Sequence, residues 1–195
     1  MKSKRLLLPA ALLLILLSIT FLARATCVPG DTGTAGNDTI TCDVANPHTG
    51  AVTGQGGDDT INIGAGVVGA VSVSGDVLGG GLPGAGNDTI TNDGSVTGIF
   101  GDASSGSGAG SDNIVNNGTV TGLVTGDAFN GSGSGNDTIV NNGTIGGTVL
   151  GDSNNTTGSG SDIIINNGTV NNTIMGDSSL GTGSGNDTIV NNGVV

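Results

Sequence analysis

The sequence GSGNDTIVNNG at residues 183–193 organises the chain, because close copies of it recur at a nearly fixed interval. The copies read GAGNDTITNDG from residue 84, GAGSDNIVNNG from 108, GSGNDTIVNNG from 133 and GSGSDIIINNG from 158. Their aspartates lie 24 or 25 residues apart, at Asp88, Asp112, Asp137, Asp162 and Asp187. A fixed period in this range is typical of a solenoid, in which each repeat forms one coil and packs against its neighbours.

Apolar and mostly β-branched residues recur at three positions of each coil, counted from its aspartate. The three columns are Ile90, Ile114, Ile139, Ile164 and Ile189; Val96, Val120, Ile145, Val170 and Val195; and Phe100, Val124, Val149 and Ile174. Such residues are typical of inward-facing positions on short strands. Gly or Asn interrupts the chain every few residues, which disfavours helices. We therefore predict an all-β parallel β-helix, with about 25 residues and about three short strands per coil.

The first 25 residues have the features of a secretory signal peptide. Basic residues near the N-terminus precede an apolar run from Leu6 to Leu22, and Ala-Arg-Ala follows at 23–25. This pattern predicts export and cleavage after Ala25. The alternative is a membrane anchor, because the apolar run approaches the length of a spanning helix. We expect an N-terminal cap at 26–50 and the solenoid at 51–195, with irregular coils to residue 83 and regular coils from residue 84.

The charge of the chain is strongly asymmetric, because every Lys and Arg lies in this first segment. After cleavage the chain would carry sixteen aspartates, with no Glu, Lys or Arg. Such an imbalance destabilises a compact fold by repulsion unless cations bind. Nucleic acids and anionic membrane surfaces are excluded as partners, since both require basic residues. The periodic Ile and Val residues argue against the disorder that an acidic chain otherwise suggests.

The expected cap contains both cysteines, Cys27 and Cys42. In an exported protein they are expected to form a disulfide, which would stabilise the fold by roughly 3 kcal/mol in the chain-entropy model. The alternative is that both thiols pair with other chains. A cap is expected at this end because the first coil of a solenoid otherwise exposes unpaired strand edges.

Two kinds of corner recur in the regular coils. The sequence Asn-Asn-Gly at 116–118, 141–143, 166–168 and 191–193 is expected to stack as an asparagine ladder, with its glycine at positive φ. At the second corner, a Gly-Asp pair ends the third strand and the motif aspartate follows ten residues later. These pairs lie at 101–102, 126–127, 151–152 and 176–177.

Stacked coils would bring the aspartates of each column close together. Like charges ~4.8 Å apart repel by about 1 kcal/mol per pair in water and about 3–4 kcal/mol at an effective dielectric of 20. Without basic residues, this arrangement favours a hard divalent cation with oxygen ligands, and Ca²⁺ is the candidate outside the cell. The alternative is that each aspartate accepts hydrogen bonds from its own turn and stays solvated.

The sequences GAGNDTIT, GSGNDTIV and GSGSDIII resemble the G-x-G-x-D-x-U-x core of RTX, or haemolysin-type, calcium-binding repeats, which supports assignment to a bacterial surface protein. In that family, turn carbonyls and the aspartate bind Ca²⁺ between successive turns. The resemblance implies as ligands Asp88, Asp112, Asp137, Asp162, Asp187, Gly135, Gly160 and Gly185. The electrostatic argument adds Asp127, Asp152 and Asp177. The period differs, because RTX repeats recur every nine residues and this motif recurs about every 25.

We expect a secreted structural or adhesive protein at the cell surface, stabilised by calcium and in contact with an extracellular surface or glycan. An ice-binding solenoid is the alternative. It would use the threonine columns Thr119, Thr144 and Thr169, and Thr89, Thr138 and Thr188, the second interrupted by Asn113 and Ile163. The chain stops at Val195 partway round a coil, so we also expect continuation or end-to-end self-association.

A polysaccharide-active β-helix enzyme is less favoured. Lyases of that kind need Arg or Lys, and sugar sites usually need aromatic platforms. The segment after residue 25 has no Lys or Arg, and its aromatic residues are two phenylalanines apart from His48. A glycosidase would need one unique pair of carboxylates, whereas here every coil carries the same residues. We therefore expect that the protein is not an enzyme.

Overall fold

The computed structural model describes most of the chain beyond the expected signal peptide. The described residues are 27–28, 30–43, 50–69, 72–76, 86–102, 110–127, 130, 133, 135–152, 158–177, 180 and 182–195. The signal peptide expected at 1–25 lies outside them. Searching these residues for a helix that is long and apolar enough to cross a membrane finds none.

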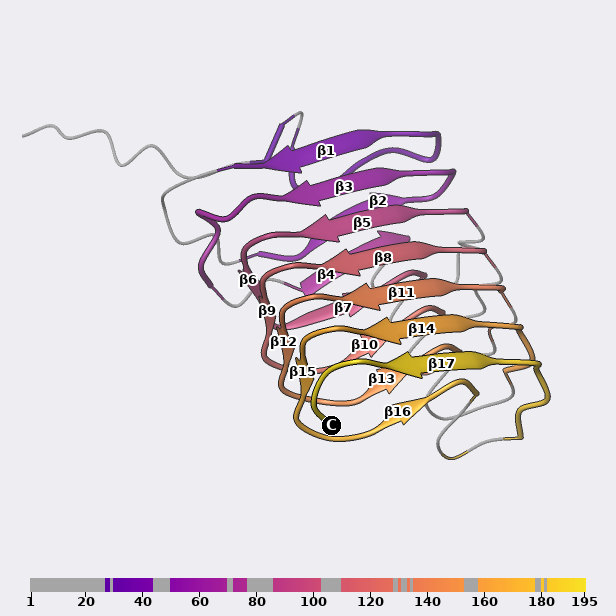
Figure 1. Cartoon of the computed structure of the whole chain (residues 1–195). Helices are drawn as coiled ribbons and strands as arrows, with labels where there is room; N and C mark the ends of the chain where they lie inside the picture. Colours follow the sequence, from indigo (N-terminus) through magenta and orange to yellow (C-terminus); the bar gives the residue numbers. More distant parts are fainter. Residues whose placement is uncertain are drawn as a thin grey trace, which may run out of the picture.

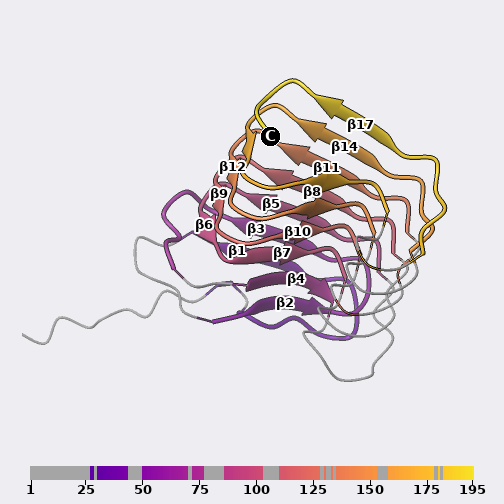
Figure 2. The ribbon, with the colours of Figure 1, turned by 90° about the horizontal axis from the view of Figure 1, so that it is seen from below.

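Parallel strands stack into three sheets around one axis, as Figures 1 and 2 show. Sheet A contains, in spatial order, β1 (Thr39–Cys42), β3 (Thr60–Ile63), β5 (Thr89–Asn92), β8 (Asn113–Asn116), β11 (Thr138–Asn141), β14 (Ile163–Asn166) and β17 (Thr188–Asn191). Sheet B contains β2 (Val52–Gln55), β4 (Ser72–Asp76), β7 (Gly98–Phe100), β10 (Val124–Thr125), β13 (Val149–Leu150) and β16 (Ile174–Met175). Sheet C contains β6 (Ser95–Val96), β9 (Thr119–Val120), β12 (Thr144–Ile145) and β15 (Thr169–Val170). The predicted parallel β-solenoid, with roughly 25 residues per coil, is therefore confirmed.

The core is built from the inward columns of these sheets. Ile139 pairs in register with Ile114 on one side and Ile164 on the other, and all three expose 1% or less of their surface. On sheet C, Ile145 lies between Val120 and Val170 in the same way. Because strands alternate their side chains between faces, one inward column of β-branched residues per sheet fills the interior.

The inward column of sheet B, predicted as Phe100, Val124, Val149 and Ile174, differs from the prediction at its first position. Val124 pairs with Ile99, and Phe100 pairs with Thr125 one place further along. Ile99 is completely buried in the core, so it takes the inward position expected for Phe100. The coil that begins at Asp88 is one residue shorter than the next, and the shortening falls between the strands of sheets C and B. Counting residues from Asp88 therefore predicts Phe100 for an inward position that Ile99 occupies.

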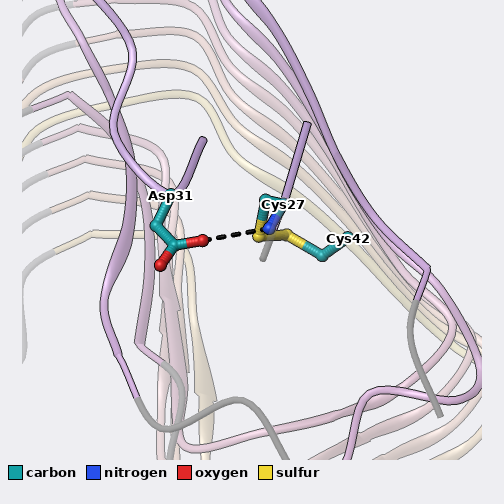
Figure 3. The surroundings of a disulfide bond; sticks show 3 residues. All are labelled: Cys27, Asp31 and Cys42. Atoms are coloured by element: carbon teal, nitrogen blue, oxygen red, sulfur yellow. Dashed lines mark hydrogen bonds between the residues drawn. A yellow bond between two sulfur atoms is a disulfide. The ribbon is translucent and has the colours of Figure 1, made fainter. Parts of the chain in front are cut away.

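Residues at the N-terminal end cover the first strands of two sheets. Cys27 and Cys42 form a disulfide with a Cα–Cα distance of 4.2 Å, and the Cys27 N–H donates to Oδ1 of Asp31 (Figure 3). Val28 forms an antiparallel bridge with Thr41 in β1, and Thr32 forms a parallel bridge with Thr53 in β2. The outer edges of sheets A and B are thus both contacted by one short segment, which limits their pairing with other chains.

The Asn-Asn-Gly corners stack as the predicted asparagine ladder. Nδ2 of Asn116 donates to Oδ1 of Asn141 at 2.8 Å, and Asn141 donates to Asn166 at the same distance. The predicted positive φ is wrong, since Gly57 is the only described glycine that has one. A Cβ on Gly143 would instead lie 2.0 Å from the carbonyl oxygen of Gly118 in the preceding coil. Glycine is needed here because the stacked corners approach closely.

Candidate metal centre

Both aspartate columns lie at the corner where each coil passes from sheet B to the next strand of sheet A. From β4 onward each strand of sheet B has a Gly-Asp aspartate at or just beyond its end, as Asp76 ends β4 and Asp127 follows β10. A motif aspartate precedes each strand of sheet A, as Asp137 precedes β11. Parallel in-register pairing repeats this placement coil after coil, so two rows of carboxylates run along the same edge of the solenoid.

Each motif aspartate accepts, at its carboxylate oxygen Oδ1, a hydrogen bond from a backbone N–H of the preceding coil. The Asp112 N–H donates to Oδ1 of Asp137 at 2.7 Å, and the Asp137 N–H donates to Oδ1 of Asp162 at 2.8 Å. The other oxygen, Oδ2, is buried without a hydrogen-bond donor in Asp59, Asp88, Asp112, Asp137 and Asp162. A Cβ on Gly126 would lie 2.1 Å from Oδ2 of Asp137. The glycine of the Gly-Asp pair therefore leaves room for this oxygen.

The Gly-Asp aspartates are covered by the glycines of the following G-x-G sequence. The Gly135 N–H donates to Oδ2 of Asp127 at 3.2 Å, and a Cβ on Gly133 would lie 2.3 Å from Cγ of the same aspartate. Gly160 and Gly185 donate in the same way to Asp152 and Asp177. These glycines thus act through N–H groups and close packing. Ligation by the carbonyls of Gly135, Gly160 and Gly185 stays a prediction.

The two rows meet in clusters of three carboxylates. Within the described residues the clusters are Asp76, Asp88 and Asp102; Asp102, Asp112 and Asp127; and Asp127, Asp137 and Asp152. One ligand atom from each member lies within 4.8 Å of the others. Opposite oxygens around a Ca²⁺ ion bound at about 2.3–2.6 Å are separated by a similar distance. The geometry is therefore compatible with one ion per cluster, and these residues could hold a metal.

Burial strongly disfavours the ionised form of these aspartates. It is the largest cause that raises the pKa of Asp112 to about 9, that of Asp137 to about 9 and that of Asp102 to about 10. Repulsion from neighbouring aspartates adds to the rise, and no Lys or Arg follows Arg24 to offset it. At neutral pH these carboxyls must hold protons or bind a cation.

The predicted ligands are only partly brought together. Of the aspartates predicted as ligands, the clusters contain Asp88, Asp112, Asp137, Asp127 and Asp152. The described clusters do not include Asp162, Asp177 or Asp187, which lie towards the C-terminal end of the rows. Asp76 and Asp102 were missed as ligands. Asp76 follows Gly75, so the Gly-Asp pattern could have identified it in an irregular coil. The alternative, in which the aspartates stay solvated, does not hold for the clusters, whose members expose 2% or less.

The two threonine columns lie on different sheets. Thr144 pairs with Thr119 and Thr169 on sheet C. Thr138 lies on sheet A, between Asn113 and Ile163. The two columns therefore do not form one flat threonine array.

No family model, curated protein or solved structure matches the chain. Its function is therefore inferred from its own residues.

Proposed function

We propose that this protein is a secreted, calcium-stabilised β-solenoid with a structural or adhesive role at the cell surface. One observation carries the proposal: buried carboxylates gather in groups of three, most of them with an oxygen that has no hydrogen-bond donor, and residues 76–152 contain no Lys, Arg or His. Isolated buried charges are strongly unfavourable, whereas coordination to a cation compensates their lost hydration. Cations would thus bind the folded chain and stabilise it relative to the unfolded chain.

Calcium suits these clusters better than other biological cations. Carboxylates without nitrogen or sulfur ligands favour hard ions. Mg²⁺ demands a tighter octahedral shell and usually retains several waters, which the buried clusters disfavour. The resemblance of the loop sequence to RTX repeats also favours Ca²⁺. Protons are the competing possibility, because a protonated Asp102 would form carboxyl–carboxylate hydrogen bonds with Asp76 or Asp127.

Titration of the chelator-stripped protein distinguishes cation binding from protonation. We expect Ca²⁺ at neutral pH to release heat or protons and to raise the melting temperature, with Mg²⁺ much less effective. A site with a Kd near 10 μM would add roughly 2.7 kcal/mol per ion at millimolar Ca²⁺. The double variant Asp112→Asn/Asp137→Asn should lose most of this calcium-dependent stabilisation. Absence of both heat and a melting shift would refute the calcium proposal.

Asp93→Asn is the matched control for these substitutions. It removes one negative charge, but Asp93 is exposed and belongs to the outer asparagine row, where Asn117 donates to its Oδ1 at 2.8 Å. The equivalent positions of later coils carry asparagine, as at Asn142 and Asn167. This variant should fold normally and bind as much calcium as the unsubstituted protein.

The proposed surface role rests on the expected export signal and on the regular rows of polar side chains that face outward from the coils. Rigid, repeated Asn and Thr side chains at a spacing of ~4.8 Å provide an extended surface for contacts with a glycan or another surface layer. Cell fractionation with N-terminal sequencing tests export, and binding to intact cells in Ca²⁺ and in EDTA tests adhesion. Ice shaping by the purified protein would instead favour the ice-binding alternative.

A further inference from the structure

Successive carboxylate clusters share members, and the two aspartate rows contribute unequally to this sharing. Asp102 belongs to the first and second clusters, and Asp127 to the second and third. The motif aspartates Asp88, Asp112 and Asp137 each belong to one cluster. A cation in each cluster would therefore contact a Gly-Asp carboxylate that its neighbouring cation also contacts.

From this overlap we infer that the corner binds a continuous row of divalent cations, one per coil, in which each Gly-Asp carboxylate bridges two successive ions. The motif carboxylate binds a single ion. This inference rests on the proposed function, since it requires that cations bind the clusters. It adds the arrangement of the ions and a different role for each aspartate row.

The charge of the repeating unit agrees with this arrangement. Each regular coil adds one Gly-Asp aspartate and one motif aspartate to the corner, as with Asp127 and Asp137. Their two negative charges equal the charge of one divalent cation. The three described clusters together contain seven aspartates, so three divalent ions compensate all but one of their negative charges. A row with one ion per coil would leave only this one end charge at any length, whereas isolated ions at alternate coils would leave more buried carboxylates uncompensated.

The two aspartate rows differ in the hydrogen bonds that their carboxylate oxygens accept, and therefore in the oxygens that remain available to a cation. Oδ1 of Asp112 accepts the Asp88 N–H at 2.7 Å, so this motif aspartate has one oxygen left for a ligand bond. Oδ2 of Asp102 accepts a longer bond of 3.3 Å from Gly110, and its Oδ1 has no donor. Asp102 is fully buried, and the long bond from Gly110 leaves its oxygens available to a cation, or to a proton shared with Asp76 or Asp127. The Gly-Asp carboxylates are therefore better placed to serve two ions.

Counting bound ions in single variants tests the sharing. The bound Ca²⁺ is measured by native mass spectrometry or by equilibrium dialysis with elemental analysis, at the lowest calcium concentration that saturates the unsubstituted protein. Asp112→Asn should remove one ion. Asp102→Asn should remove two, because both clusters that contain it lose a charge. The control Asp93→Asn should remove none.

The possible results separate this inference from the proposed function. If Asp102→Asn and Asp112→Asn each remove one ion, sharing is refuted although calcium binding remains. If the unsubstituted protein binds no calcium, the proposed function itself fails. Asp127→Asn and Asp137→Asn repeat the comparison one coil further along, in case Asp102→Asn does not fold.

A measurement on the unsubstituted protein removes the dependence on folding of the variants. With Mn²⁺ as the probe, electron paramagnetic resonance at saturation should show strong magnetic coupling between ions separated by about one coil spacing. The spectrum of isolated Mn²⁺ ions at saturation would overturn the continuous row.

Discussion

Removing the cations should make the folded protein less stable at neutral pH than at mildly acidic pH. Burial raises the pKa of Asp137 from 3.8 to about 9. Between these two values the folded chain holds a proton that the unfolded chain has released. Rising pH therefore favours unfolding, so the stabilisation present below pH ~4 is lost progressively as pH approaches the folded pKa.

The expected size of the effect follows from the same shift. One such carboxyl lowers the free energy of unfolding by about 1.4 kcal/mol per pH unit, or roughly 2.7 kcal/mol between pH 5 and pH 7. For a chain of this size, 1 kcal/mol corresponds to roughly 2–4 °C in melting temperature. We therefore expect the melting temperature to fall by roughly 5–10 °C if the whole row behaves as a single such group. Additional groups, such as Asp112, would increase the fall.

Calorimetric or circular dichroism melts at pH 5, 6 and 7 measure this effect, each in EDTA and in millimolar Ca²⁺. Because Ca²⁺ binds the ionised carboxylates and competes with protons, its stabilising effect should be larger at pH 7 than at pH 5. Asp137→Asn should reduce the pH slope in EDTA, while Asp93→Asn should leave it unchanged. A melting temperature in EDTA that stays constant or rises from pH 5 to pH 7 would refute the reasoning.

Three further predictions concern the fold. Ile139→Ala should lower the free energy of unfolding by about 2–5 kcal/mol because it leaves a cavity in the completely buried column; Val140→Ala on the outer face should cost much less, and equal costs in chemical denaturation would contradict the register. Gly143→Ala should also lower the denaturation midpoint, because its Cβ would lie 2.0 Å from a carbonyl oxygen of the preceding coil; an unchanged midpoint would show that the corners can separate. Replacing Cys27 and Cys42 by Ser should cost roughly 3 kcal/mol, and light scattering should then detect association through the uncovered strand edges; a monodisperse, equally stable variant would show that the cap does not need the disulfide.

The architecture could be predicted from the sequence because a solenoid repeats its own local rules. A residue at one position of a coil meets the same position of the next coil, so a period of about 25 residues fixes both the strand stacking and the inward columns. The ladder from Asn116 to Asn141 follows from the same logic. The predicted inward position of Phe100 is wrong, because that coil is one residue shorter and counting from the aspartate no longer gives the register.

The candidate site depends on distances that the sequence does not contain. Asp102 and Asp112 are ten residues apart in the chain, and the sequence does not show that they converge with Asp127 of the following coil. Nor does it show that Asp102 belongs to two clusters. The sequence determined the two aspartate rows and their lack of basic partners. Only the tertiary structure decided that the rows meet, because the separation of two corners depends on how closely the backbone packs between them, and glycines such as Gly126 and Gly133 permit that close approach.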